Sequence, residues 1–156
     1  MDNSEHLKIN TENFSINILK NVNDIWFEYR QINTNMPEAF GVLIGSKDLV
    51  TEHYKIVNVT VPQQGDRCSR MSFTLMDPAH QRIVDTHYRD SGGELVYRGT
   101  WHTHPEGIPR ASNVDIRDWR KCKERNQDKQ LFFIIIGTEK KALYYFVGEN
   151  LLRHEF

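Results

Sequence analysis

LFFIII, residues 131–136, is an uninterrupted run of large apolar side chains in an otherwise polar neighbourhood. A run of this length, rich in β-branched and aromatic residues and bounded by polar segments, is typical of a strand buried on both faces of a sheet. We therefore expect it to be the central strand of the fold. The polar turn TEKK (138–141) and the apolar segment ALYYFVG (142–148) follow, and a final short strand is expected to include Leu151 and Leu152.

The segments before this run show both strand and helix patterns. LVYRGTWHTH (95–104) reads as a strand that Pro105 should end, and Ser112 to about Asn126 reads as a helix. Between Ile18 and Tyr29 the apolar residues recur at helical spacing, which predicts an amphipathic helix. Further strands are expected at EAFGVLIG (38–45), HYKIVNVTVP (53–62) and MSFTLM (71–76), with a second helix that begins with Asp77 as N-cap and Pro78 as first residue and runs to about Arg89.

These elements predict an α/β fold, a single domain over residues 1–156 with a mixed β-sheet flanked by helices, because the strands and helices do not follow a strict βαβ rhythm. The 20 Lys and Arg nearly balance the 21 Asp and Glu, so no overall charge attracts nucleic acid or an anionic membrane. No apolar run approaches the roughly 18 residues of a membrane span, and the N-terminus lacks the pattern of a signal peptide. We expect a cytoplasmic protein without nucleic-acid or membrane partners; its oligomeric state stays open. Cys68 and Cys122 are expected to be two reduced thiols.

HTHPEGIPRASNVD, residues 102–115, carries side chains that could bind a metal ion. His102 and His104 share one face of the expected strand, with Cα atoms about 6.6 Å apart, so their imidazoles could chelate one ion. A turn could bring Asp115 to the same ion and leave a fourth position for water, as in catalytic zinc sites. The alternative is structural, since Ser112 and Asp115 have the spacing of a helix capping box and paired histidines on a strand are often only solvated. The spacing alone leaves both interpretations open.

Together these residues resemble the signature of the JAMM metalloproteases, also called MPN-plus or Mov34-type isopeptidases. That signature is HxHP, a serine eight residues after the second histidine, and an aspartate three residues further. The family also has a glutamate at the start of an early strand, and PEAFGVLIG (37–45) resembles that context and carries Glu38. WHTHPE is similar to the prokaryotic branch, and Ala111, where many members have proline, removes no chemical group. The residues that match the signature are His102, His104, Pro105, Ser112 and Asp115.

The resemblance covers nearly the whole chain and implies a cytidine-deaminase-like JAMM/MPN domain. It implies one Zn²⁺ per chain, bound by His102, His104 and Asp115, with Glu38 as general base and Ser112 as hydrogen-bond donor to the oxyanion. The implied reaction is hydrolysis of the amide bond after the C-terminus of a ubiquitin-like protein or of a partner conjugated by E1-like and E2-like proteins. Similar stand-alone proteins accompany such E1-like and E2-like proteins in bacterial anti-phage (CBASS-type) operons, in one case acting on a nucleotidyltransferase (CD-NTase) that makes cyclic oligonucleotides.

Two other classes of function remain as alternatives. A non-catalytic MPN scaffold keeps the fold but typically lacks the metal ligands, all of which are present here. A non-haem iron oxygenase also uses two histidines and a carboxylate, usually as HxD or HxE followed by a distant histidine. Asp118 is a candidate for orienting a ligand from beside the site, and Thr103, on the opposite strand face, is expected to be structural together with Trp101. The histidines assigned to no metal are His6, His53, His80, His87 and His154.

Overall fold

A computed structural model of the chain describes residues 5–33, 35–68, 73–74 and 78–156. Within these residues the strands of the main sheet are β1 (Glu5–Asn10), β2 (Ser15–Leu19), β3 (Phe40–Lys47), β4 (His53–Val59), β7 (Val96–Thr103), β8 (Phe132–Ile136), β9 (Lys141–Val147) and β10 (Asn150–Glu155). The helices are α1 (Lys20–Tyr29), α2 (Ala79–Asp90) and α3 (Asn113–Arg125), and a second, small sheet joins β5 (Arg67–Cys68) to β6 (Phe73–Thr74).

The main sheet has eight strands in the order β1-β2-β4-β3-β7-β8-β9-β10. β2 runs parallel to β4 and β7 parallel to β8, while the other neighbours are antiparallel, so the predicted mixed sheet is confirmed. β8 comes from the LFFIII run. It lies between β7 and β9 with every residue buried, as expected of an interior strand covered on both faces.

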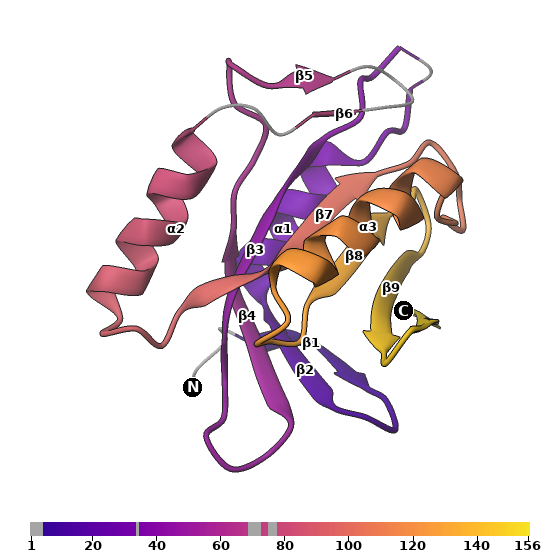
Figure 1. Cartoon of the computed structure of the whole chain (residues 1–156). Helices are drawn as coiled ribbons and strands as arrows, with labels where there is room; N and C mark the ends of the chain where they lie inside the picture. Colours follow the sequence, from indigo (N-terminus) through magenta and orange to yellow (C-terminus); the bar gives the residue numbers. More distant parts are fainter. Residues whose placement is uncertain (1–4, 34, 69–72, 75–77) are drawn as a thin grey trace.

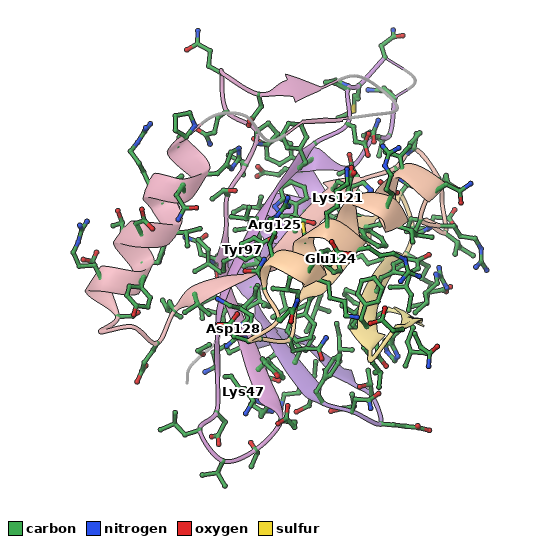
Figure 2. All side chains as sticks on the ribbon, viewed as in Figure 1. Lys47, Tyr97, Lys121, Glu124, Arg125 and Asp128 are labelled. Atoms are coloured by element: carbon green, nitrogen blue, oxygen red, sulfur yellow. The ribbon has the colours of Figure 1, made fainter. Side chains whose placement is uncertain are left out.

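The sheet separates α1, which packs in one core cluster, from α2 and α3, which pack in the others; Figure 1 shows α1 behind the sheet and α3 in front of it. Alternate residues of β8 face the two layers. Phe132 joins the cluster that includes Trp26 of α1, whereas Phe133 joins the cluster that includes Trp119 of α3. Val84 of α2 packs against β3 on that second face. The outward face of α3 is charged and includes the labelled side chains Lys121, Glu124 and Arg125 (Figure 2).

The N-terminal part of the fold differs from the sequence prediction. Ile18 belongs to β2, so the predicted helix from Ile18 to Tyr29 is wrong at its start, and α1 begins at Lys20. β1 and β2 form an antiparallel hairpin that was not predicted from the sequence. Ile18 is fully buried by pairing beside β4 and packing in the core, so tertiary contacts override the helical spacing of its side chain.

The other boundaries shift by a few residues. β3 begins at Phe40, so Glu38 precedes the strand and does not lie in it. Pro78 is the N-cap of α2 and not its first residue, while Asp77 and most of the MSFTLM segment lie outside the described residues. The predicted limits of the third helix are confirmed, with Ser112 as N-cap and Asn126 as C-cap. No helix among the described residues is long and apolar enough to cross a bilayer.

A β-bulge in β7 precedes the two histidines of the site. Pairing with β3 shifts register between Leu43, opposite Gly99, and Ile44, opposite Tyr97. Gly99 has φ of +120°, and a Cβ there would stand 1.8 Å from the carbonyl oxygen of Phe132. Only glycine fits that backbone and that close approach of β8. Beyond the bulge, His102 pairs with Phe40, the first residue of β3. The two histidines therefore lie at the end of the sheet where the segment that carries Glu38 leads into β3.

Candidate metal centre and active site

Four of the five predicted site side chains come from three separate parts of the fold and meet at one end of β7. His102 is in β7 and His104 follows its last residue, Glu38 lies two residues before β3, and Asp115 is in the first turn of α3. The cluster is largely buried: the side chains of His102 and Glu38 are 1% and 2% exposed, and those of Asp115 and His104 are 11% and 14% exposed.

The donor atoms of this cluster face one another. The Nε2 atoms of His102 and His104 are 3.1 Å apart. Oδ2 of Asp115 lies 3.3 Å from Nε2 of His102 and 3.4 Å from Nε2 of His104. Oε1 of Glu38 is slightly farther, at 3.6 and 3.7 Å from the same nitrogens. The four side chains therefore converge on one point.

These distances test whether a zinc ion fits. Two donors that bind one zinc ion at about 2.0–2.1 Å in tetrahedral geometry lie about 3.3 Å apart. The three separations among His102, His104 and Asp115 are close to this value, so their donor atoms outline one face of a zinc tetrahedron. Glu38 with the two histidines forms a second group, whose donor atoms lie within 4.8 Å of one another. The geometry thus allows Glu38 to stand beside an ion held by the other three or to ligate it.

Burial and charge set the protonation of the cluster. Burial raises the pKa of Glu38 to about 8; His104 opposes this rise and Asp115 adds to it. Burial also lowers the pKa of His102, although Asp115 partly offsets the effect. Burial also disfavours the charged form of His104, but the carboxylates of Asp115, Glu38 and Glu106 favour it more strongly. The pKa of His104 is therefore raised. Burial would raise the pKa of Asp115, yet hydrogen bonds from both imidazoles overcome it and hold that pKa well below its usual range. The site therefore contains one fixed anion, Asp115, and one carboxyl group, Glu38, that binds a proton near neutral pH.

The capping box at the start of α3 is present. Asp115 donates its backbone N–H to Oγ of Ser112 at 3.0 Å, and Ser112 donates its backbone N–H to Oδ2 of Asp115 at 2.9 Å. The same Oδ2 faces the two histidines, so the capping bond holds it toward them. Because Oγ of Ser112 accepts the capping bond, its own hydrogen is free to be donated to another group. The structural and the chemical interpretation of these two residues are compatible.

Glu106 is a site residue that was not predicted from the sequence. Its Oε1 lies 2.9 Å from Nδ1 of His104, which fixes Nδ1 as the protonated nitrogen when the ring is neutral. Nε2 of His104 then presents its lone pair to the cluster. A carboxylate that orients a metal-binding imidazole is a common feature of zinc sites. The only sequence signal for this contact was the short spacing, since Glu106 follows His104 by two residues.

The remaining candidates lie elsewhere. The carboxylate of Asp118 is 57% exposed and pairs with Arg117 at 3.8 Å, so it does not orient a ligand of the cluster. His80 contacts a carboxylate, Asp66, at 2.6 Å, but belongs to no group of three metal-binding side chains among the described residues.

Cys122 is a free thiol, as expected, and the side chain of Cys68 is outside the described part. The hydrogen bonds of His53 reach Ser15 and Asn17, and that of His87 reaches Asn58.

Comparisons with known proteins point in the same direction. The family described as prokaryotic homologs of the JAB domain matches residues 30–147. The chain is 36% identical over 91 residues to a CD-NTase/cGAS isopeptidase of Escherichia coli (strain TW11681), covering 58% of this chain and 57% of that protein. It is 34% identical over 113 residues to the Vibrio cholerae protein of the same name, covering 71% and 69%. A Pseudomonas aeruginosa protein, again of that name, is 34% identical over 108 residues, covering 69% and 66%.

The chain therefore spans between 57% and 69% of the length of these curated relatives. One solved structure, the solution structure of a protein from Desulfitobacterium hafniense, superposes with a TM-score of 0.58 at 23% identity and covers 89% of both chains. That likeness concerns the fold, and it agrees with the mixed sheet described above.

Proposed function

Because the chain belongs to the family of prokaryotic homologs of the JAB domain, we propose that it is a zinc-dependent isopeptidase whose active site is the cluster of Glu38, His102, His104, Ser112 and Asp115. The observation that carries this proposal is the convergence of two Nε2 atoms and one carboxylate oxygen at 3.1, 3.3 and 3.4 Å, with a second, buried carboxyl group beside them. A non-catalytic scaffold would have no use for that second group.

His102, His104 and Asp115 would hold the ion. Zinc bound by three protein ligands supplies Lewis acidity and a water molecule that is acidic near neutral pH. Glu38 would accept the proton of the attacking water and deliver it to the leaving amine, because its buried carboxyl group lies 3.6 and 3.7 Å from Nε2 of the two histidines. Ser112 would donate its hydroxyl hydrogen to the oxyanion that forms on the scissile carbonyl.

We propose a protein substrate joined through its C-terminus, and more narrowly a CD-NTase conjugated by E1-like and E2-like proteins. The three relatives are named CD-NTase/cGAS isopeptidases, which supports this class of substrate. The small net charge of −1 fits a protein substrate better than a nucleic acid.

The test uses the zinc-loaded protein and CD-NTase C-terminal fusions, with zinc content and cleavage rate measured on the same preparation. We expect about one zinc per chain and cleavage that a chelator abolishes and added zinc restores. Glu38→Gln should keep zinc and fold while turnover falls by about 10²–10⁴, the usual worth of a general base. Full cleavage at a verified zero metal content would refute the mechanism. Loss of zinc in Glu38→Gln would make Glu38 a ligand, and stoichiometric iron would favour an oxygenase.

A further inference from the structure

The carboxylate of Glu38 is not fixed by hydrogen bonds of its own. Its Oε2 is buried without a hydrogen-bond partner among the described residues, and its Oε1 stands 3.6 and 3.7 Å from the two imidazoles, beyond hydrogen-bond range. Glu38 also precedes β3, so the regular ladder of the sheet does not constrain it. Apart from packing around the buried side chain, the position of the Glu38 backbone therefore determines where the carboxyl group lies.

Thr103, the residue between the two histidines, holds that backbone. Ala39 donates its N–H to Oγ1 of Thr103 at 2.9 Å, and Thr103 donates its N–H to the carbonyl of Ala39 at 2.9 Å. Thr103 is fully buried and Ala39 is 5% exposed, so water does not compete for these bonds. The residue directly after Glu38 is thus tied on both of its polar groups to the residue directly after His102.

Gln31 fixes the threonine hydroxyl. Since Oγ1 of Thr103 accepts from Ala39, its hydrogen is donated to Oε1 of Gln31, at 2.8 Å. The other end of the same amide donates from Nε2 to the carbonyl of Met36 at 3.1 Å. One buried amide therefore joins the segment that carries Glu38 to the strand that carries the histidines, and it sets the direction in which the hydroxyl lone pairs point.

We infer that Thr103 and Gln31 are positioning residues that hold Glu38 at its working distance from His102 and His104. The inference rests on the proposed function, in which Glu38 is the base. It assigns to Thr103 more than the packing role expected from its strand face. A base displaced by about 1 Å can lose on the order of 10²-fold in rate, so a clamp on the neighbouring peptide group has a kinetic effect.

The experiment compares Thr103→Val, which keeps the shape but removes the hydroxyl, with Thr103→Ser, which keeps it. Hydrogen exchange of the Ala39 amide is measured by NMR, and kcat, KM and zinc content are measured on the same protein. We expect Thr103→Val to lose protection of the Ala39 amide and roughly 10–100-fold in kcat, with KM and zinc content unchanged. Thr103→Ser should retain most of the protection of the Ala39 amide and most of the wild-type kcat.

Thr60→Val is the matched control. Thr60 is also buried, and its Oγ1 also accepts a backbone N–H of β3, that of Val42, at 2.8 Å. This variant should expose the Val42 amide to exchange but leave kcat within about twofold, because Val42 lies well inside the strand and four residues from Glu38. An equal fall in kcat for Thr60→Val and Thr103→Val would show that any lost hydrogen bond in this sheet lowers kcat, and would contradict a specific positioning role for Thr103.

Gln31→Leu keeps the inference testable if Thr103→Val does not fold. It leaves the Ala39 bond in place and releases the hydroxyl, so kcat should fall less than in Thr103→Val, at unchanged KM. Wild-type kcat in a folded Thr103→Val, or in Gln31→Leu where Thr103→Val is unfolded, overturns the inference while the proposed function stands. If wild type and Glu38→Gln are equally inactive on every fusion, the proposed function has failed and the inference falls with it.

Discussion

Asp115 uses one carboxylate oxygen in two ways. Its Oδ2 accepts the N–H of Ser112 and also faces Nε2 of both histidines, so the bond that caps α3 aims a charged oxygen at the proposed ion. An anion is favoured there in any case, because the first turn of a helix presents unpaired N–H groups and a positive dipole end. The capping and ligand interpretations, which the sequence alone left open, describe the same geometry.

Glu106 should tune the affinity of the site for zinc. Glu106→Ala removes the acceptor for Nδ1 of His104, so the ring can rotate or change tautomer, and we expect zinc to bind roughly 10–100-fold more weakly. Glu106→Gln keeps an acceptor oxygen without the charge and should lose less zinc affinity than Glu106→Ala. Competition with a chromogenic chelator measures the affinity. Glu124→Ala, on the exposed face of α3, is the control, and equal affinities for wild type and Glu106→Ala would remove Glu106 from the site.

Glu38 should destabilise the metal-free protein as pH rises. Its pKa is about 8 in the folded state but about 4.3 in an unfolded chain, so the unfolded state releases this proton first. The favourable contribution of the protonated group is complete below about pH 4.3 and is lost as pH rises through the folded value. Glu38→Gln should therefore match wild type near pH 4.5 and exceed it by roughly 2–5 kcal/mol at pH 9. Urea unfolding with chelator present measures the difference, and a constant difference across this range would contradict the burial of a proton on Glu38.

The residue pattern identified the members of the cluster but not their interactions. The spacing of His102, His104, Ser112 and Asp115 is local, so a single stretch of sequence shows it. Glu38 was found through the resemblance, because a contact across 64 positions has no local signal. The hydrogen bonds of Thr103 were beyond prediction, since they depend on how the loop before β3 folds back onto β7.

At the level of elements, Ser112 at the start of α3 has two roles: it caps the helix, and it is the proposed hydrogen-bond donor to the oxyanion. Two substitutions can separate these roles. Ser112→Ala should cost about 1 kcal/mol of unfolding free energy through loss of the cap, whereas Ser112→Gly should cost only a few tenths. Both lack the hydroxyl and should lose turnover, by about 10²–10³-fold for one oxyanion donor. Thermal unfolding and cleavage rates on the two variants give the comparison. If turnover falls with stability, so that Ser112→Gly is nearly as active as wild type, Ser112 is a cap alone.

Elements whose residues share one environment, such as β8 and α3, were predictable, whereas the β1–β2 hairpin and the junction of β2 with α1 were not. Every residue of β8 is buried, and α3 has its N-cap and its C-cap at the expected positions. Between Leu19 and Lys20, however, a strand passes directly into a helix without a loop. The apolar side chains on the two sides of this junction continue a helical spacing by coincidence, so periodicity cannot locate it.

Considered as a whole, the molecule holds its site with a core that requires no ion. The residues on both faces of the central strands are almost fully buried, from Trp26 and Trp101 on the α1 side to Trp119 and Phe133 on the α3 side. The proposed ligands stand at one end of this framework and contribute little apolar area to it. A structural zinc site, by contrast, replaces a core that a small domain cannot form.

We therefore expect zinc to change the stability of the protein but not its fold. Chelator-treated protein should keep its far-UV circular dichroism and a cooperative thermal transition, and added zinc should raise Tm, because an ion that binds only the folded state stabilises it by about 2.7 kcal/mol at 100 times its Kd. Asp115→Ala should lose most of the zinc-dependent rise, since one of the three donor atoms disappears. Asp118→Asn, one turn further along α3 and 57% exposed, should keep the full rise. A collapse of the circular dichroism in chelator would show that the ion is part of the folding core, and a full rise in Asp115→Ala would leave this aspartate as a helix cap, with Glu38 as the third ligand in its place.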